Sequence, residues 1–388
     1  MKKRSFLLIV LCLCVALGGC AFPFAPQFES EKYLEAFQNN WCYRSLGEAL
    51  QADYGDLYTA VQDGMHTDTV VTVAGEKPIT GDGVAVTLSH PLKTQEEMYR
   101  LYTAFTNDNP QFFFLSRHYG IEGYEKNEDA SYHRMILLYT MNAAERQTAQ
   151  AALEDAGEAV LAQAAGKDAF ETELFLHDWL AAHCTYEKKD TETLSLYDAY
   201  GALVKGRAVC EGYARAMQWL LNKSGIPCTL VNGNDRDGNA HMWNMVTVDG
   251  ENYHLDATWD DTDDLLRHNY FNLTTDEIGV SHKIAADNIG IPICTATAAN
   301  FYRRTGRYID TYSRHEIAER IAAAVKAGET TVELRFAEGK YDNAALFIKS
   351  GNYFFDTMKK KLGSPLWSFD LYGEQTEGIL MLVKTEKS

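Results

Sequence analysis

The sequence predicts an α+β protein with more than one domain. Its 388 residues exceed the usual size of one domain, so two or three folded units are expected. Helical periodicities and short runs of β-branched or aromatic residues both occur along the chain. The apolar share of 46% and only 8 prolines are typical of a folded globular chain rather than a disordered one.

The first twenty residues resemble the signal of a bacterial lipoprotein. Residues 2–4 are basic, residues 6–17 are apolar, and the string LGGC ending at Cys20 is similar to a lipobox. The resemblance implies cleavage of residues 1–19 and lipidation of Cys20, whose two acyl chains suffice for stable membrane anchoring. An ordinary secretory signal with an incidental cysteine is the alternative. Residues 20–30 are expected to be a short tether.

The net charge indicates which partners to expect. Loss of the signal removes three basic residues, so the formal charge moves from −18 to −21. Nucleic acid is therefore not an expected partner, because phosphate binding needs a clustered basic surface. No other apolar run reaches the length of a membrane span, so we expect the remaining chain outside the cytoplasmic membrane, in the cell envelope.

The cysteines do not form a disulfide or metal-binding pattern. Two of the eight leave with the signal and Cys20 is expected to carry lipid, which leaves five scattered thiols. A single bridge between two of them stays open, but no C-x-x-C or H-E-x-x-H motif occurs. The acidic stretches around residues 233–240 and 260–264 are expected to be solvated loops rather than calcium sites. We expect no metal and no cofactor.

Residues 31–150 form the expected N-terminal α+β region. Its helical segments are EKYLEAFQNNWCYRSLGEAL and TQEEMYRLYTAFTND, and its strand-like segments are DTVVTVAG, QFFFLS and HRMILLYT. Residues 142–165 are expected to form a long helix. A second helix follows at once, because Asp168 and Glu171 have the spacing of a capping box.

Residues 151–290 and 291–388 form the two other expected domains. The first contains a helix that ends at Ser224-Gly225 and a hairpin with Asp249-Gly250 at its turn. The second is expected to be a small α+β domain, with a helix that begins at Ser313 and another near residues 343–362.

Cys210 lies at the start of an expected helix in GRAVCEGYARAMQWLL, residues 206–221. A cysteine is nucleophilic only as its thiolate, which unpaired N–H groups and the helix dipole favour at the first turn. The same N–H groups can hold a developing oxyanion. A packing cysteine is expected further along, on the face of Met217 and Leu221. The position therefore favours a reactive thiol over the alternative of a buried core cysteine.

A nucleophilic cysteine needs a base, and the base needs an orienting group. His241 begins the expected strand HMWNMV, and Asp256 follows on the next expected strand in YHLDATW. Since side chains alternate along strands, a loop with an even number of residues places His241 and Asp256 on one side, whereas an odd loop separates them. If both side chains lie on the same side of the sheet, the carboxylate would orient the imidazole and stabilise its charged form.

Three strings resemble the transglutaminase-like superfamily in its exported bacterial branch: GRAVCEGYARAMQWLLNKSGIPCTLVNG, HMWNMVTVDGENYHLDATWDD and NYFNLTTDEIGVSH. The resemblance implies a papain-like α+β core, with a helix bearing the cysteine packed on an antiparallel sheet bearing the histidine and aspartate. Cys210, His241 and Asp256 match the family's triad in chain order. Met242 departs from the pattern, because the family usually has alanine there, and this puts the width of the acyl site in doubt.

Other residues around the triad are expected to support it, and for the oxyanion donor the expectation comes from the resemblance. Tyr186 is the candidate side-chain donor to the oxyanion, with Tyr197 or Tyr200 as alternatives. Three residues are expected to wall the substrate site: Trp243, Trp259 and Met242. Four others are expected to be structural: Cys184, Cys228, His177 and His254. His282 matches a family position but has no assigned role.

The expected function is acyl transfer at a peptide or glutamine amide in the cell envelope. Water as acceptor gives hydrolysis and a primary amine gives a crosslink, and the exported branch slightly favours a protease or amidase. The expected partner is a protein or peptide substrate, with a cell-wall peptide among the options. The alternative is a non-catalytic lipoprotein that uses the same fold as a binding or scaffolding module.

Overall fold

The computed structural model describes residues 31–126, 129–188, 194–262 and 265–385. The chain divides into two compact units, one with residues up to 247 together with 281–292, and the other with residues 248–280 and 293–388. This division falls inside the expected domain of residues 151–290. In the described part of the chain, each helix is too short or too polar to cross a membrane.

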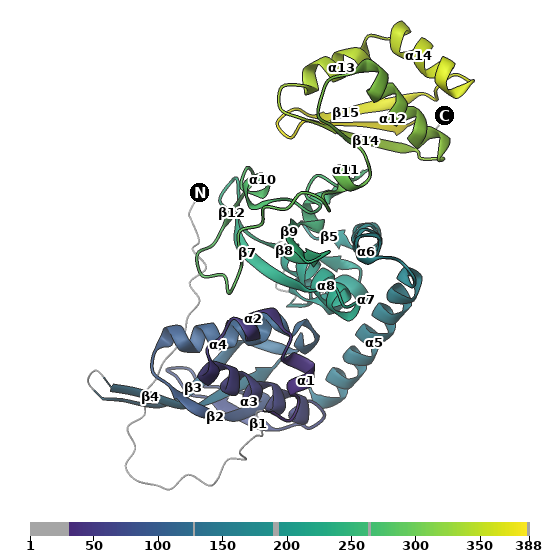
Figure 1. Cartoon of the computed structure of the whole chain (residues 1–388). Helices are drawn as coiled ribbons and strands as arrows, with labels where there is room; N and C mark the ends of the chain where they lie inside the picture. Colours follow the sequence, from purple (N-terminus) through teal and green to yellow (C-terminus); the bar gives the residue numbers. More distant parts are fainter. Residues whose placement is uncertain (1–30, 127–128, 189–193, 263–264, 386–388) are drawn as a thin grey trace. The chain divides into compact units, whose positions relative to one another are not determined.

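The first unit begins with an antiparallel sheet, and helices pack against one of its faces (Figure 1). Side-chain alternation on β4 separates the two faces: Met135 and Leu137 join the core with the helices, whereas Ile136 and Leu138 pack on the other face. The strands, in sheet order, are β1 (Val70–Val73), β2 (Ile79–Leu92), β4 (Asp129–Tyr139) and β3 (Leu115–Lys126). The helices are α1 (Leu34–Phe37), α2 (Trp41–Arg44), α3 (Glu48–Gly64) and α4 (Gln95–Asp108).

Two parts of this region differ from the sequence prediction. The expected strand QFFFLS begins instead as a 3₁₀ turn at Pro110–Phe112, and β3 starts only at Leu115. Proline at the first position of the turn suits a helical φ, and this favours the turn over a strand. Strand β2 was not among the expected strands, and it contains two glycines, Gly81 and Gly83. At Gly83 a Cβ would lie 2.2 Å from the Leu137 carbonyl oxygen, so the close neighbouring strand requires glycine.

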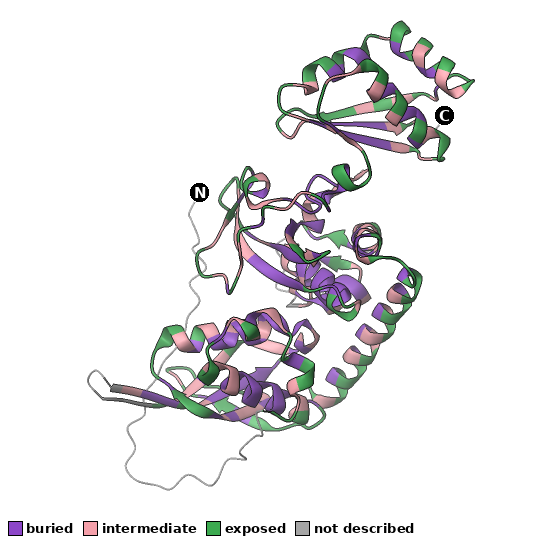
Figure 2. Cartoon of the chain, in the orientation of Figure 1, coloured by how far each residue is buried: buried purple, intermediate pink, exposed green. Residues whose placement is uncertain are grey.

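Four helices lead from this sheet to the region of the expected nucleophile. The capping box of Asp168 and Glu171 is confirmed at the start of α6. The last helix is mostly buried (Figure 2), and Gly225, with a φ of +79°, follows its end. The helices are α5 (Ala143–Leu161), α6 (Ala169–His183), α7 (Ala199–Val204) and α8 (Cys210–Lys223).

Helix α8 packs beside a second antiparallel sheet of the first unit. Its strands there are β12 (His282–Ile284), β7 (Cys228–Asp235) and β8 (Ala240–Val248), in that order. The Asn244 side chain donates from β8 to the carbonyl of Ala214 on α8 over 2.9 Å. This buried hydrogen bond connects the helix that begins at Cys210 with the strand that holds His241.

The second unit contains a short connecting region and a C-terminal α+β domain. The connecting region has β9 (Glu251–Leu255), α9 (Ala257–Asp260), the two-residue strands β10 (Asp261–Thr262) and β11 (Leu265–Leu266), α10 (Thr275–Ile278) and α11 (Phe301–Arg304). The domain's sheet has the order β13 (Tyr308–Ile309), β14 (Thr331–Phe336), β16 (Ile379–Lys384) and β15 (Phe369–Glu374). The helices α12 (Arg314–Lys326), α13 (Tyr341–Lys349) and α14 (Asn352–Leu362) complete one apolar core with this sheet.

Near residues 343–362, where one helix was expected, the structure has two. Helix α13 ends before Ser350, and Gly351 adopts a φ of +70° before α14 begins. A positive φ interrupts an α-helix, and glycine adopts it at little steric cost. The α+β class expected from the sequence is confirmed.

Candidate active site

Cys210 is the first residue of α8, and Val209 before it has extended backbone. The residue is partly exposed, and its thiol is not in a disulfide. The N–H groups of the first turn have no partner within the helix, and the helix dipole adds partial positive charge there. The structure therefore places the thiol where the sequence predicted, at the end of a helix that can support a negative sulfur or oxygen atom.

The start of α8 is positioned by the close approach of the chain at Gly212 and by a pair of short strands just before Cys210. A Cβ on Gly212 would lie 2.6 Å from the Leu196 carbonyl oxygen, so only glycine allows the chain to approach this closely. Just before Cys210, β6 (Arg207–Ala208) runs parallel to β5 (Thr185–Tyr186), with Tyr186 opposite Ala208. Tyr186 is 37% exposed. The candidate oxyanion donor thus lies on the strand beside the segment that leads into the nucleophile.

His241 is buried near the start of β8, with two aromatic neighbours. Its ring is 5.9 Å from the Trp243 ring in a stacked arrangement and 5.1 Å from the His282 ring, measured between centroids. The hydroxyl of Ser281 lies 2.7 Å from Nδ1 of His282. Strands β12 and β8, on either side of β7, therefore bring two imidazoles together in the first unit.

Asp256 directly follows β9 and is 1% exposed. Its Oδ1 accepts hydrogen bonds from the backbone N–H groups of Thr258 at 3.0 Å and Trp259 at 3.3 Å, so the carboxylate caps α9. The turn between β8 and β9 has two residues, Asp249 and Gly250, both with positive φ. The loop is thus even, the condition that the sequence argument left open.

The three residues expected to line the substrate site, Trp243, Met242 and Trp259, differ in burial and in direction. Trp243 is buried, and a Cβ on Gly233 would meet its ring at 2.7 Å, so the ring packs across that glycine. Strand alternation directs Met242 to the face opposite His241 and Trp243. Trp259, in the second unit, is partly buried and packs edge-on against Tyr270. Cys20 lies outside the described residues.

The other four described cysteines are buried, unlike Cys210. All are free thiols, which answers the open question of a bridge within the described part of the chain. Burial raises the pKa of Cys42 and of Cys228 well above the ordinary value, and it raises that of Cys294 to about 11. Cys184 is also buried, as expected. Such thiols stay protonated and unreactive at neutral pH.

His177 and His254 are fully buried, and each has a polar partner. Nδ1 of His177 lies 3.0 Å from the Asp178 carboxylate, and Nε2 of His254 lies 3.2 Å from the Thr275 hydroxyl. Both contacts agree with the structural role expected for these histidines.

A cavity of about 900 Å³ lies at the far end of α8. The helix contributes Trp219, Asn222 and Lys223 to its lining, and α5 contributes Gln147 and Gln150. With a rise of about 1.5 Å per residue, these α8 residues are roughly 13–20 Å along the axis from Cys210. This cavity is therefore separate from the region where the thiol could react.

Sequence reasoning gave no role at the candidate site to two residues that lie near its helix and its histidine. Asn244 was not singled out, although an asparagine within the apolar string MWNMV signals a buried polar role. His282 was noticed without a role, and only the pairing of β12 with β7 brings it to His241. No local pattern predicts that contact, because the two histidines are 41 positions apart in the sequence.

Comparison with known proteins supports the resemblance over part of the chain. Residues 159–257 match the model of the transglutaminase-like superfamily. This match contains all three residues of the expected triad. No curated protein matches the chain.

Three solved structures resemble the chain at low identity. One is described as a TGase, at 16% identity, a TM-score of 0.27, and coverage of 37% of this chain and 46% of that one. A candidate cysteine protease from Cytophaga hutchinsonii has 13% identity, a TM-score of 0.23, and coverage of 37% and 63%. A candidate protease from Parabacteroides distasonis has 18% identity, a TM-score of 0.23, and coverage of 34% and 29%. The chain spans less than two thirds of each of these structures.

Proposed function

We propose that the transglutaminase-like region, residues 159–257, is the core of a cysteine acyl-transfer enzyme with Cys210 as nucleophile. The observation behind this proposal is the contrast among the thiols. Cys210 is partly exposed at the first turn of α8, whereas the other described cysteines are buried. A thiol kept for packing would have no reason to differ from the other four in this way.

In this proposal, the Cys210 thiolate attacks the carbonyl carbon of a peptide or glutamine amide. The oxyanion that forms accepts hydrogen bonds from N–H groups at the start of α8, with the Tyr186 hydroxyl as an additional donor. His241 takes the thiol proton and gives it to the departing amine or ammonia, which leaves a thioester on Cys210. Water or a primary amine then attacks the thioester, and the thiol is released.

Asp256 is the proposed orienting group for His241. The even turn at Asp249 and Gly250 supports this role, because alternation along a two-residue hairpin gives both side chains the same direction. A carboxylate there selects the tautomer that can accept the thiol proton and stabilises the imidazolium. His282, whose ring lies 5.1 Å from that of His241, adds a second polar neighbour to the base.

Hydrolysis of a peptide or amide is the proposed outcome, with an envelope protein or wall peptide as substrate. The signal-like start of the sequence supports this setting, since lipid on Cys20 would hold the mature chain at a membrane surface. Cys20→Ser should then release the chain from the membrane fraction of expressing cells. Its continued retention there would contradict the anchor.

The enzyme proposal is tested by the rate at which iodoacetamide alkylates each cysteine of the mature chain at pH 7. We expect Cys210 to react much faster than the other cysteines, and His241→Ala to slow it at least about tenfold by removing the base. Mass spectrometry of the labelled peptides identifies the site. His66→Ala, which removes an exposed histidine, is the matched control and should leave the rate unchanged.

A Cys210 thiol that reacts like an ordinary free thiol, and equally fast in His241→Ala, would contradict the enzyme and favour the scaffolding alternative. Incubation with envelope lysate then identifies the substrate. A fragment bound to Cys210 as a thioester is expected in the wild type and not in Cys210→Ala.

A further inference from the structure

We infer that Arg117, a residue of the N-terminal sheet, is a positioning residue that keeps Cys210 reactive by neutralising Glu211. This inference rests on the proposed function, because it concerns the same thiol. Glu211 directly follows Cys210 and is the second residue of α8. Arg117 lies 94 positions earlier in the sequence, near the start of β3.

The Glu211 carboxylate is held between two arginines. Its Oε2 accepts from Nη2 of Arg117 at 2.6 Å, and its Oε1 accepts from Nε of Arg215 at 3.0 Å. Only 19% of the Glu211 side chain is exposed, so water screens its charge less than it would at an open surface. The arginines thus provide the main compensation for this charge.

The position of Glu211 has two opposite effects. A carboxylate in the first turn stabilises the helix, because it complements the positive end of the helix dipole. The same charge opposes the formation of a second negative charge on the adjacent thiol. With both arginines in place, Glu211 can stabilise the helix without strongly disfavouring the thiolate.

The charge of this group also acts on a neighbouring acid. Asp198 caps α7 by accepting from the N–H of Gly201 at 2.7 Å. Its pKa is raised to about 7, chiefly by burial; the charge of Arg215 lowers it and that of Glu211 raises it. The electrostatic influence of Glu211 therefore extends beyond its own ion pairs.

The N-terminal region contacts α8 along one face. Glu211, Arg215 and Gln218 are four and three residues apart, so they lie on the same side of the helix. Arg215 donates to the carbonyl of Thr106 and Gln218 to that of Asn107, each over 2.8 Å. These contacts place the region that supplies Arg117 directly against the helix that begins at Cys210.

Arg117 is the member of this group that can be removed most safely. Its side chain is 53% exposed, and its guanidinium lies 4.6 Å from the centre of the Tyr197 ring. An ion pair this exposed contributes little to folding. Arg215 is only 14% exposed and also donates a hydrogen bond to the Thr106 carbonyl, so its loss would disturb packing as well as charge.

The test is the alkylation rate of Cys210 in Arg117→Ala at pH 7 and low ionic strength. We expect the rate to fall about three- to tenfold, the size of effect that one nearby charge produces in a partly screened site. Adding Glu211→Gln to Arg117→Ala should restore the rate to within about twofold of Glu211→Gln alone, because no charge is left to neutralise. Arg44→Ala, at another exposed arginine of the same region, is the control and should match the wild type.

Thermal unfolding of each variant accompanies the rates, and Arg117→Ala should melt close to the wild type. A double variant that stays as slow as Arg117→Ala would show that Arg117 acts through packing, and this would overturn the inference. So would an Arg117→Ala rate equal to that of the wild type while His241→Ala remains slow, a result that leaves the proposed function intact. An unreactive wild-type thiol, unaffected by His241→Ala, would overturn the proposed function itself.

Discussion

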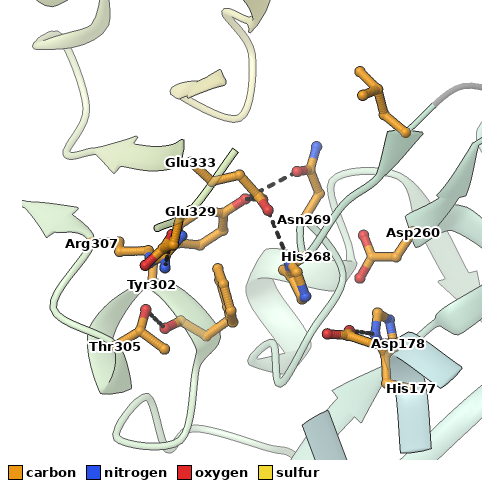
Figure 3. Close-up of polar contacts among 12 residues, drawn as sticks. His177, Asp178, Asp260, His268, Asn269, Tyr302, Thr305, Arg307, Glu329 and Glu333 are labelled. Carbon is orange, nitrogen blue, oxygen red and sulfur yellow. Dashed lines mark hydrogen bonds and ion pairs between the residues drawn. The ribbon is translucent and has the colours of Figure 1, made fainter. Parts of the chain in front are cut away.

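The N-terminal and C-terminal regions each contact the rest of their unit through polar side chains, but the two sets of contacts differ in burial. Along α8, the charged contact of the N-terminal region is half-exposed, because Arg117 pairs with Glu211 near the surface, although the nearby hydrogen bond from Gln218 to Asn107 is buried. The C-terminal domain uses Glu333 on β14, which is 3% exposed. Its carboxylate accepts from Nδ1 of His268 at 2.8 Å and from the Tyr302 hydroxyl at 2.9 Å (Figure 3).

The buried network extends beyond the carboxylate. The ring of His268 stacks on that of Phe301, with centroids 3.8 Å apart. The Tyr302 hydroxyl also lies 3.1 Å from Oδ1 of Asn269. Burial, together with the charge of Glu333, raises the pKa of Tyr302 well above its ordinary value, so this hydroxyl keeps its proton and remains a donor.

The difference in burial gives the two polar contacts different roles, one in stability and the other in the charge near Cys210. A buried network stabilises when every member has a partner and costs free energy when one is removed, so it suits a permanent connection. A half-exposed ion pair contributes little to folding but still alters the charge near a reactive group. We therefore expect changes at Glu333 to affect stability and changes at Arg117 to affect reactivity.

The largest effect is expected for Glu333→Ala. This change leaves the buried Nδ1 of His268 without its acceptor and removes one of the two acceptors of the Tyr302 hydroxyl, so the free energy of unfolding should fall by about 3 kcal/mol. Denaturant unfolding measures the change. Glu338→Ala, at an exposed position after β14, is the control and should stay within about 0.5 kcal/mol of the wild type. A cost below about 1 kcal/mol at Glu333 would remove the contrast between the two regions.

A smaller effect is expected where α5 packs against α8. A Cβ on Gly157 would lie 2.0 Å from the ring of Trp219, which is buried, so the ring or the helix would have to shift. Alanine favours a helix by about 1 kcal/mol over glycine, but overpacking should outweigh this gain. Gly157→Ala should therefore lower the unfolding free energy by about 1–2 kcal/mol in thermal or denaturant unfolding. Glu158→Ala on the same helix controls for local effects, and a more stable Gly157→Ala would contradict the close packing.

The smallest effect is expected as a pH dependence within the N-terminal region. Burial raises the pKa of Asp53 to about 7, although the His90 N–H donates to its Oδ1 at 2.8 Å. Because the folded chain holds this proton more tightly than the unfolded chain, the contribution is present at low pH and is lost as the pH rises through about 7.

Wild-type stability should therefore fall between pH 5 and pH 8, and Asp53→Asn should reduce that fall by about 1 kcal/mol. Equilibrium unfolding at the two pH values measures it. Asp63→Asn is the control: hydrogen bonds from Lys32 and Tyr33 outweigh burial and lower the pKa of Asp63, so it is ionised throughout this range. An equal pH dependence in wild type and Asp53→Asn would contradict the assignment.

Local chemistry explains why much of the framework could be predicted. The capping box at Asp168, the start of α8 at Cys210 and the turn at Asp249 and Gly250 all depend on neighbouring residues. The features that differ from the prediction depend on residues that are distant in the sequence. Strand β2 contains glycine because another strand approaches it closely, a fact that its own residues do not reveal.

The sequence by itself determined that Cys210 begins a helix, beside the positive end of the helix dipole and its unpaired N–H groups, because the start of a helix depends on neighbouring residues. It also placed a hairpin turn at Asp249-Gly250 after His241 but left the number of residues in the loop open, and the structure shows that the loop has two. The tertiary structure alone decided that His282 contacts His241, that Arg117 reaches Glu211 and that Glu333 becomes the buried acceptor for His268. These contacts join residues from 41 to 94 positions apart, and only the packing of whole elements brings such side chains together.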